Sequence, residues 1–192
     1  MGNRISKVVT RTGDAGETGL ADTRRVGKDS LRINAIGEVD ELNSMIGLAV
    51  CKSISEEVKT ELRQVQNDLF GLGGELAGSR NTRIGEKQVL RIENAALHFN
   101  RDLPPLKEFV LPGGSEEASL LHLARSICRR AERSIVALGK KEEISPVQIQ
   151  YLNRLSDLLF VLARLANKMA NHPDVIWEKK DYSERLSNSM QA

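Results

Sequence analysis

Apolar residues recur at three- and four-residue steps along most of the chain beyond its N-terminal segment. This is the spacing of one face of an α-helix, which repeats every 3.6 residues. The pattern predicts five helices, over residues 30–50, 54–78, 89–99, 121–138 and 145–171. In the fourth and fifth runs the steps alternate between three and four, which is typical of left-handed packing between nearly parallel helix axes. We therefore predict an all-α, five-helix bundle with mostly antiparallel neighbours.

The predicted helix ends carry residues that favour starting or stopping a helix. Pro104 and Pro105 end the third helix, because proline lacks an amide hydrogen and restricts the residue before it. At the start of the fifth helix, Ser145 can cap, Pro146 suits the first helical position and Gln148 can complete a capping box. No alternation typical of β-strands, internal repeat or long linker is present, so the sequence indicates a single domain.

The segment before the first helix, TRTGDAGETGLADTRRVGKDS, is too polar to belong to a core. Glycines that permit inward-facing amides, threonine hydroxyls and cations together suit a polyphosphate. These residues are Thr10, Arg11, Thr12, Gly13, Gly16, Thr18, Gly19 and Lys28. Neither GxxxxGKS, GxxxxGKT nor GxGxxG is present, so an anion-binding loop and a flexible arm both stay open. The domain, residues 1–192, divides into this N-terminal loop (1–29), the bundle (30–171) and a C-terminal tail (172–192).

The predicted fourth helix contains LLHLARSICRRAER, where charged residues lie beside the apolar stripe. At 100° per residue, Arg125, Arg129 and Glu132 fall within an arc of about 60° that flanks the stripe, whereas Arg130 points elsewhere. Two interpretations stay open for this face. It is either a groove that binds a ligand, or a solvated surface whose ion pairs contribute roughly a few tenths of a kcal/mol each.

The first and fifth predicted helices add polar side chains at the borders of their packed faces. Asn153 lies one turn from Asp157, where its amide either contacts a polar ligand or faces water. Asp40 follows Val39 at the edge of the first helix's apolar face. Its carboxylate is therefore a candidate partner for Arg125, on another helix or on another subunit.

Charge and cysteine content narrow the class of function. The 28 basic and 26 acidic residues nearly balance and aromatic residues make up only 4%, so no nucleic-acid partner is expected.

Cys51 and Cys128 form no CxxC pair, and we expect both to be reduced, buried thiols in a cytoplasmic protein. No signal-peptide core and no apolar stretch of about 18 residues is present, so no membrane partner is expected. No metal-ligand motif or serine nucleophile elbow is visible, so an enzyme with these residues would stabilise charge rather than move protons.

Six of these segments, in this order, resemble the motifs of the PduO-type ATP:cob(I)alamin adenosyltransferases, the corrinoid adenosyltransferases that make coenzyme B12. They are TRTGDAGETGL, RVGKD, GEVDELNSMIGLA, FVLPGG, ARSICRRAER and YLNRLSDLLFVLAR. The likeness runs from Thr10 to about Lys179, which is nearly the whole chain. The sequence departs from the family pattern at Ala21, Asp22 and Thr23, which replace a more usual aromatic and glycine-rich stretch.

The resemblance implies a nucleotide site built from the N-terminal loop and the arginine-rich helix. The residues that would bind ATP are Thr10, Arg11, Thr12, Gly13, Thr18, Gly19, Lys28, Arg129, Arg130, Glu132, Arg133 and Asn153. Arg129 would be the catalytic side chain, and Asp40 and Arg125 would form a salt bridge between subunits of a homotrimer. Phe109 would lie against the corrin and displace the lower cobalt ligand, leaving four-coordinate cobalt that is easier to reduce to Co(I). The loop is expected to become ordered when ATP binds.

The implied reaction transfers the 5′-deoxyadenosyl group of ATP to cob(I)alamin and yields adenosylcobalamin and inorganic triphosphate. Co(I) is itself a very strong nucleophile, so this chemistry needs no general base. Arg129, Lys28 and Mg²⁺ would stabilise the leaving triphosphate. A flavin reductase and a B12-dependent enzyme would be the further partners of such an enzyme. The alternative is a non-catalytic helical carrier of ATP or corrinoid that delivers its ligand to such an enzyme.

Overall fold

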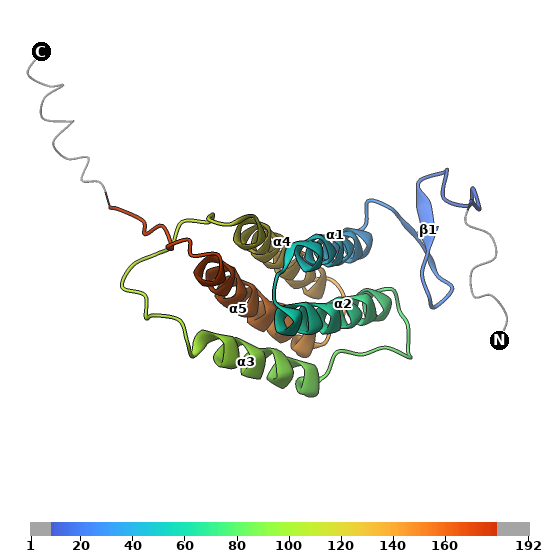
Figure 1. The fold of residues 1–192 in the computed structure, drawn as a ribbon. Coiled ribbons are helices and arrows are strands. Elements are labelled where there is room, and N and C mark those ends of the chain that lie inside the picture. Colours follow the sequence, from blue (N-terminus) through green and yellow to red (C-terminus); the bar gives the residue numbers. More distant parts are fainter. Residues whose placement is uncertain (1–8, 180–192) are drawn as a thin grey trace, which may run out of the picture.

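The computed structural model describes residues 9–179 and contains five helices and one small β-hairpin (Figure 1). The helices are α1 (Leu31–Lys52), α2 (Glu56–Leu76), α3 (Glu86–Asn100), α4 (Glu116–Gly139) and α5 (Pro146–Met169). The predicted all-α, five-helix bundle is thereby confirmed, and none of the described helices is long and apolar enough to cross a membrane. The ends of the predicted N-terminal loop and C-terminal tail, 1–8 and 180–192, lie outside the described residues.

Serine side chains start three of the helices. Ser30, Ser55 and Ser115 each accept a hydrogen bond from the backbone amide three residues later, which satisfies a donor that the first turn leaves free. At α5, Pro146 occupies the first turn as predicted, but the Ser145 side chain makes no capping hydrogen bond. The predicted capping box is therefore wrong, because the Gln148 side chain is buried and lines a pocket instead.

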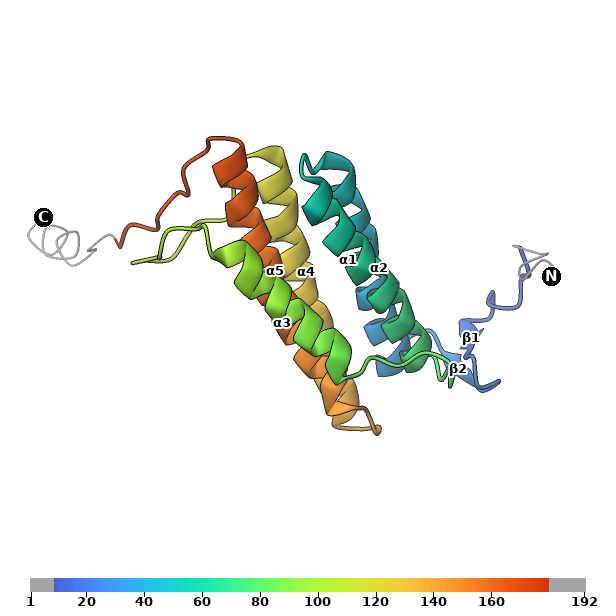
Figure 2. The same ribbon diagram turned by 60° about the horizontal axis from the view of Figure 1, so that its bottom comes forward.

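α1 packs antiparallel against α2 and α4, and α5 packs antiparallel against α4, whereas α3 runs parallel to α5 (Figure 2). At one end of the bundle, Arg32 near the start of α1 pairs with Glu142 just beyond α4, at an Nη2–Oε2 distance of 2.7 Å. At the other end, the amide of Ile54 donates to the Glu117 carboxylate at the start of α4. Buried residues lie on several faces of α5, because α3 and α4 cover different sides of it.

The two cysteines lie in different environments. Cys128 is fully buried in α4, where burial raises the pKa of its thiol. Cys51 is exposed on the last turn of α1, so the prediction of a buried thiol is wrong for this residue. The apolar stripe of α1 passes through the buried Ala49, and a residue two positions later lies about 200° round the helix.

The hairpin was not predicted from the sequence. Its strands, β1 (Glu17–Gly19) and β2 (Arg25–Gly27), pair antiparallel beyond the ends of α1 and α2 (Figure 1). The amide of Ala21 donates to the Ala77 carbonyl at 2.8 Å, which attaches the turn to the end of α2. Gly78 has a φ of +87°, and a Cβ atom there would lie 2.6 Å from the Asp22 carboxylate. The turn that departs from the family pattern therefore packs closely against α2 because residue 78 is a glycine.

Candidate nucleotide and corrinoid site

The loop before β1 forms the first part of the predicted nucleotide site. Positive φ angles at Arg11 (59°) and Gly16 (84°) turn its backbone, and the Lys28 amide donates to the Gly16 carbonyl at 2.8 Å. Gly13 lies next to the Lys28 side chain, since a Cβ atom at position 13 would be 3.1 Å from its Nζ atom. Among residues 9–179, neither Arg11 nor Lys28 forms an ion pair. The loop therefore presents two cations that an anion can neutralise.

The threonines of this segment are held by the hairpin. The hydroxyls of Thr10 and Thr12 lie 3.0 Å apart, and Arg25 of β2 donates to the Thr12 carbonyl at 2.8 Å. Thr18 and Gly19 belong to β1. All seven N-terminal residues predicted to bind ATP thus lie in or beside one hairpin, which their sequence order alone did not establish.

The second part of the predicted site lies on α4 and α5. Arg129 and Arg133 are exposed on α4, and Arg133 donates to the Arg129 carbonyl at 3.0 Å. Neither arginine forms an ion pair with the described residues of the chain. Glu132 is half-buried between them and accepts a hydrogen bond from Asn153 of α5 at 3.3 Å. The structure therefore brings these four predicted residues together.

Arg154 of α5 is a neighbour that the sequence analysis did not select. Its Nη1 atom donates to the side-chain oxygen (Oδ1) of Asn153 at 2.7 Å, and its Nε atom lies 3.4 Å from the Glu93 carboxylate of α3. These contacts fix the orientation of the Asn153 amide, so that its nitrogen faces Glu132. The only signal in the sequence was a cation adjacent to Asn153, which is too common to be informative.

Arg130 differs from its neighbours because its charge is already paired. It contacts Glu38 and Glu41 of α1, with an Nε–Oε2 distance of 2.5 Å to Glu38. Both carboxylates belong to the same chain, so this arginine joins α4 to α1. Its predicted contact with ATP stays a prediction, and any such contact would compete with these two ion pairs.

The two parts of the nucleotide site are separate within one chain. Across the described residues, no hydrogen bond or ion pair joins the N-terminal loop to Arg129, Glu132 or Arg133. The hairpin lies beyond the ends of α1 and α2, whereas these three residues lie within α4 (Figures 1 and 2). A single chain therefore presents two sets of cations at different places on its surface.

Phe109 lies in the connection between α3 and α4 and is 76% exposed. It lines an open pocket of about 480 Å³ together with His122, Arg125, Asp157 and Phe160. The Arg125 guanidinium carbon is 5.6 Å from the centroid of the Phe160 ring, a cation–π distance. Arg125 has no carboxylate partner among residues 9–179. The pocket thus combines an aromatic surface with a cation, which suits a large, partly apolar ligand.

His122, which also lines this pocket, is only 3% exposed. Its ring packs edge-on against Phe160, with 6.1 Å between the ring centroids. Both ring nitrogens are buried and have no hydrogen-bond partner in the part of the chain that the structure describes. Burial, reinforced by the positive charge of Arg125, lowers the pKa of His122, so the imidazole is neutral at pH 7.

Replacing His122 with leucine should weaken the dependence of stability on acid pH. Below about pH 6.5 the unfolded chain binds a proton at His122 that the folded chain does not bind. The stability that neutral His122 contributes is therefore fully present above that pH. It is lost as the pH falls from there through the lowered pKa of His122 in the folded chain. Thermal midpoints at pH 7.0 and 5.5 should differ less in H122L than in the wild type, whereas H172Q, at an exposed histidine, should match the wild type. An equal drop in H122L and the wild type would contradict this assignment.

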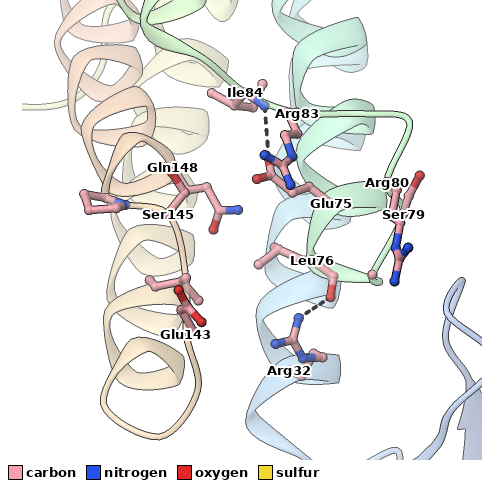
Figure 3. A pocket seen from close by; sticks show the side chains of 13 residues that line it. Arg32, Glu75, Leu76, Ser79, Arg80, Arg83, Ile84, Glu143, Ser145 and Gln148 are labelled. Atoms are coloured by element: carbon pink, nitrogen blue, oxygen red, sulfur yellow. Dashed lines mark hydrogen bonds between the residues drawn. The ribbon is translucent and has the colours of Figure 1, made fainter.

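A second, more polar pocket of about 580 Å³ lies where α2 ends and α5 begins (Figure 3). Arg32, Arg83, Glu75 and Gln148 line it from different elements. Arg32 donates to the Leu76 carbonyl, and Glu75 accepts a hydrogen bond from the backbone of the loop after α2 (Figure 3). Arginines and carboxylates both line this pocket, and none of the predicted site residues does.

The fold and these sites define a class of protein. It is an all-α bundle that presents cations without ion-pair partners among the described residues, on an N-terminal loop and on α4, and it has an aromatic pocket lined by Arg125 of α4. The family profile described as cobalamin adenosyltransferase matches residues 8–166. The chain belongs to this family, and the resemblance inferred from its motifs is confirmed.

Individual relatives agree over almost the whole chain. A cobalamin adenosyltransferase of Cupriavidus metallidurans is 53% identical over 181 residues, which cover 94% of this chain and 98% of the relative. A corrinoid adenosyltransferase of Bacillus subtilis is 44% identical, with 97% and 100% covered. Among solved structures, a variant PduO-type ATP:corrinoid adenosyltransferase from Lactobacillus reuteri, complexed with cobalamin and ATP, is similar with a TM-score of 0.85. It is 35% identical, and the match covers 91% of this chain and 98% of that one.

Proposed function

We propose that the protein transfers the 5′-deoxyadenosyl group of ATP to cob(I)alamin, forming adenosylcobalamin and inorganic triphosphate. Relatives named as corrinoid adenosyltransferases match nearly the full chain, and the similar solved structures include complexes with cobalamin and ATP. The structural observation that carries the proposal is Arg129, which forms no ion pair within residues 9–179 and lies one turn along α4 from Arg125 in the aromatic pocket. The non-catalytic carrier is not favoured, because these relatives are transferases.

The chemistry requires charge stabilisation rather than proton transfer. Co(I) supplies the electron pair that forms the Co–C5′ bond, the C5′–O bond breaks, and triphosphate leaves with that bonding pair. No proton moves in this step, so the site needs no general base. Arg129 and Lys28 would stabilise the negative charge on the leaving group. Mg²⁺ would enter with the nucleotide as MgATP.

We also propose that the active sites form between the subunits of a homotrimer, because the two cationic sets do not meet in one chain. An apolar groove of about 390 Å³ between α1 and α2 contains Asp40, together with Phe70, which is 77% exposed. Asn43 lines the same groove, and its side-chain oxygen is buried without a hydrogen-bond partner among the described residues. Asp40 forms no ion pair within the described part of its own chain, so Arg125 of a neighbouring subunit can neutralise it.

The other expected properties follow from the same proposal. ATP would order the N-terminal loop by neutralising Arg11 and Lys28, and the loop would then close on α4 of the neighbour. Formation of Co(I) requires an electron donor, for which a flavin reductase is the proposed partner. A B12-dependent enzyme would receive the product, and the cytoplasm is the expected compartment.

An anaerobic assay tests the proposed reaction. The protein is mixed with cobalamin, a chemical reductant, Mg²⁺ and ATP, and the absorbance of Co(I) is followed as it is converted to that of adenosylcobalamin. Turnover should require both ATP and protein. Binding of ATP and cobalamin without any turnover would favour the carrier, and no spectral change with fully reduced cobalamin would contradict the enzyme.

A further inference from the structure

The segment that follows α5, residues 172–177, runs back along the loop that carries Phe109; we call it the C-terminal strap. The amide of Trp177 donates to the Phe109 carbonyl at 2.7 Å, and the amide of Leu111 donates to the Val175 carbonyl at 2.8 Å. Between these contacts, residues 110 and 176 form an antiparallel β-bridge. The strap therefore fixes the backbone of the loop at Phe109 itself.

Two buried polar side chains of α5 anchor both the strap and the loop. Arg164, which is 4% exposed, pairs with Asp174 of the strap at 2.8 Å and donates to the Pro104 carbonyl at 2.8 Å. Asn167, which is 2% exposed, donates to Asp174 at 3.3 Å and to the Gly113 carbonyl at 3.1 Å. A buried guanidinium that loses its carboxylate partner strongly destabilises a protein, so the contact with Asp174 stabilises the strap in this position.

The side chains of Trp177 and Phe109 also contact each other. Their rings lie edge to face, with centroids 6.4 Å apart and an angle of 67° between the planes. Phe109 lines the aromatic pocket, whereas Trp177 does not. Phe109 is otherwise largely exposed, so this contact restricts its rotamers. Trp177 thus acts on the pocket through Phe109.

We propose that Trp177 is a positioning residue that holds the Phe109 ring at the angle needed to lie against the corrin. This inference rests on the proposed function, since Phe109 has this role only if the pocket takes a corrinoid. Without Trp177, the Phe109 ring samples other rotamers. Corrinoid binding must then fix the ring in one rotamer, and the lost conformational entropy weakens the affinity. The N-terminal loop and α4 are unchanged, so ATP binding is not affected.

Kinetics of W177A and W177F in the full chain test this role. W177A should raise the KM for cob(I)alamin about three- to ten-fold, the size of an aromatic edge contact, and leave the KM for ATP unchanged. The spectroscopic signal of four-coordinate Co(II), formed from cob(II)alamin and ATP, should weaken in parallel. W177F should restore both properties, because phenylalanine keeps an aromatic edge. L90A, which removes an exposed apolar side chain of α3, should behave as the wild type.

A double-mutant cycle separates positioning from direct contact. If Trp177 acts through Phe109, the F109A/W177A variant has the same corrinoid KM as F109A. If the two substitutions raise the KM for cob(I)alamin additively, the proposal is overturned. A wild-type KM and a wild-type Co(II) signal in W177A would overturn it as well. Should W177A fail to fold, W177L provides the same comparison. Absence of turnover in the wild type and L90A would instead contradict the proposed function.

Discussion

The Arg129→Ala variant is expected to lose about 10²–10³-fold in kcat for adenosyl transfer, the usual cost of removing one preorganised charge-stabilising group. Its binding of ATP should remain measurable, because Lys28, Arg11 and Arg133 still face the phosphates in the proposed site. Arg129 is exposed and has no ion pair with residues 9–179, so its removal leaves no buried carboxylate unpaired. Anaerobic turnover and calorimetric titration with MgATP measure the two effects separately.

Two further variants make the Arg129 result specific. Arg129→Lys keeps the positive charge but not the planar guanidinium, so its kcat should lie between those of the wild type and the alanine variant. Arg63→Ala removes an exposed arginine of α2 that is absent from every predicted site, and should retain full turnover. Undiminished turnover in Arg129→Ala would remove this residue from the mechanism.

Mixing two inactive variants should restore activity if each site is shared between subunits. Lys28→Ala damages the loop half of the site, and Arg129→Ala damages the helix half, so homotrimers of either variant should turn over poorly. In randomly mixed trimers, one interface in four combines an intact loop with an intact helix. Co-expression should therefore recover about a quarter of the wild-type activity, because a cyclic trimer joins different faces of its neighbours.

The matched control for this experiment combines two variants of the same half. Co-expressed Arg129→Ala and Arg133→Ala leave no intact helix half, so their mixture should not exceed the mean of the two separate proteins. Different affinity tags on the two chains show that mixed oligomers have formed. Mixed oligomers of the Lys28 and Arg129 variants without recovered activity would place the whole site within one chain.

Much of the site was predictable because its motifs are contiguous. Arg129, Glu132 and Arg133 lie within two turns of one helix, so helical geometry alone places them on neighbouring faces. The sequence also suggested that Asn153 borders a packed face, and the structure joins it to Glu132. The sequence did not predict that Arg130 is ion-paired whereas its neighbour Arg129 is not, because the two carboxylates that pair with Arg130 belong to α1.

Other errors came from contacts between distant segments. The caps that the structure shows at Ser30, Ser55 and Ser115 form within the first turns of their own helices, whereas the Gln148 side chain is buried instead of completing the predicted capping box. Cys51 was misassigned because its burial depends on which face of the last turn of α1 meets a neighbour. Local propensity describes one helix at a time, whereas burial is decided by its neighbours.

By itself, the sequence determined the number and type of the helices and the family, because spacing and motif order are properties of the contiguous chain. Only the tertiary structure decided that the loop and α4 present their cations at separate places. It also decided that Trp177 lies against Phe109, although the two residues are 68 positions apart in the sequence. The physical reason is that the segment bearing Trp177 is held by the buried ion pair between Arg164 and Asp174. Arg164 becomes buried only when α5 packs against α3 and α4.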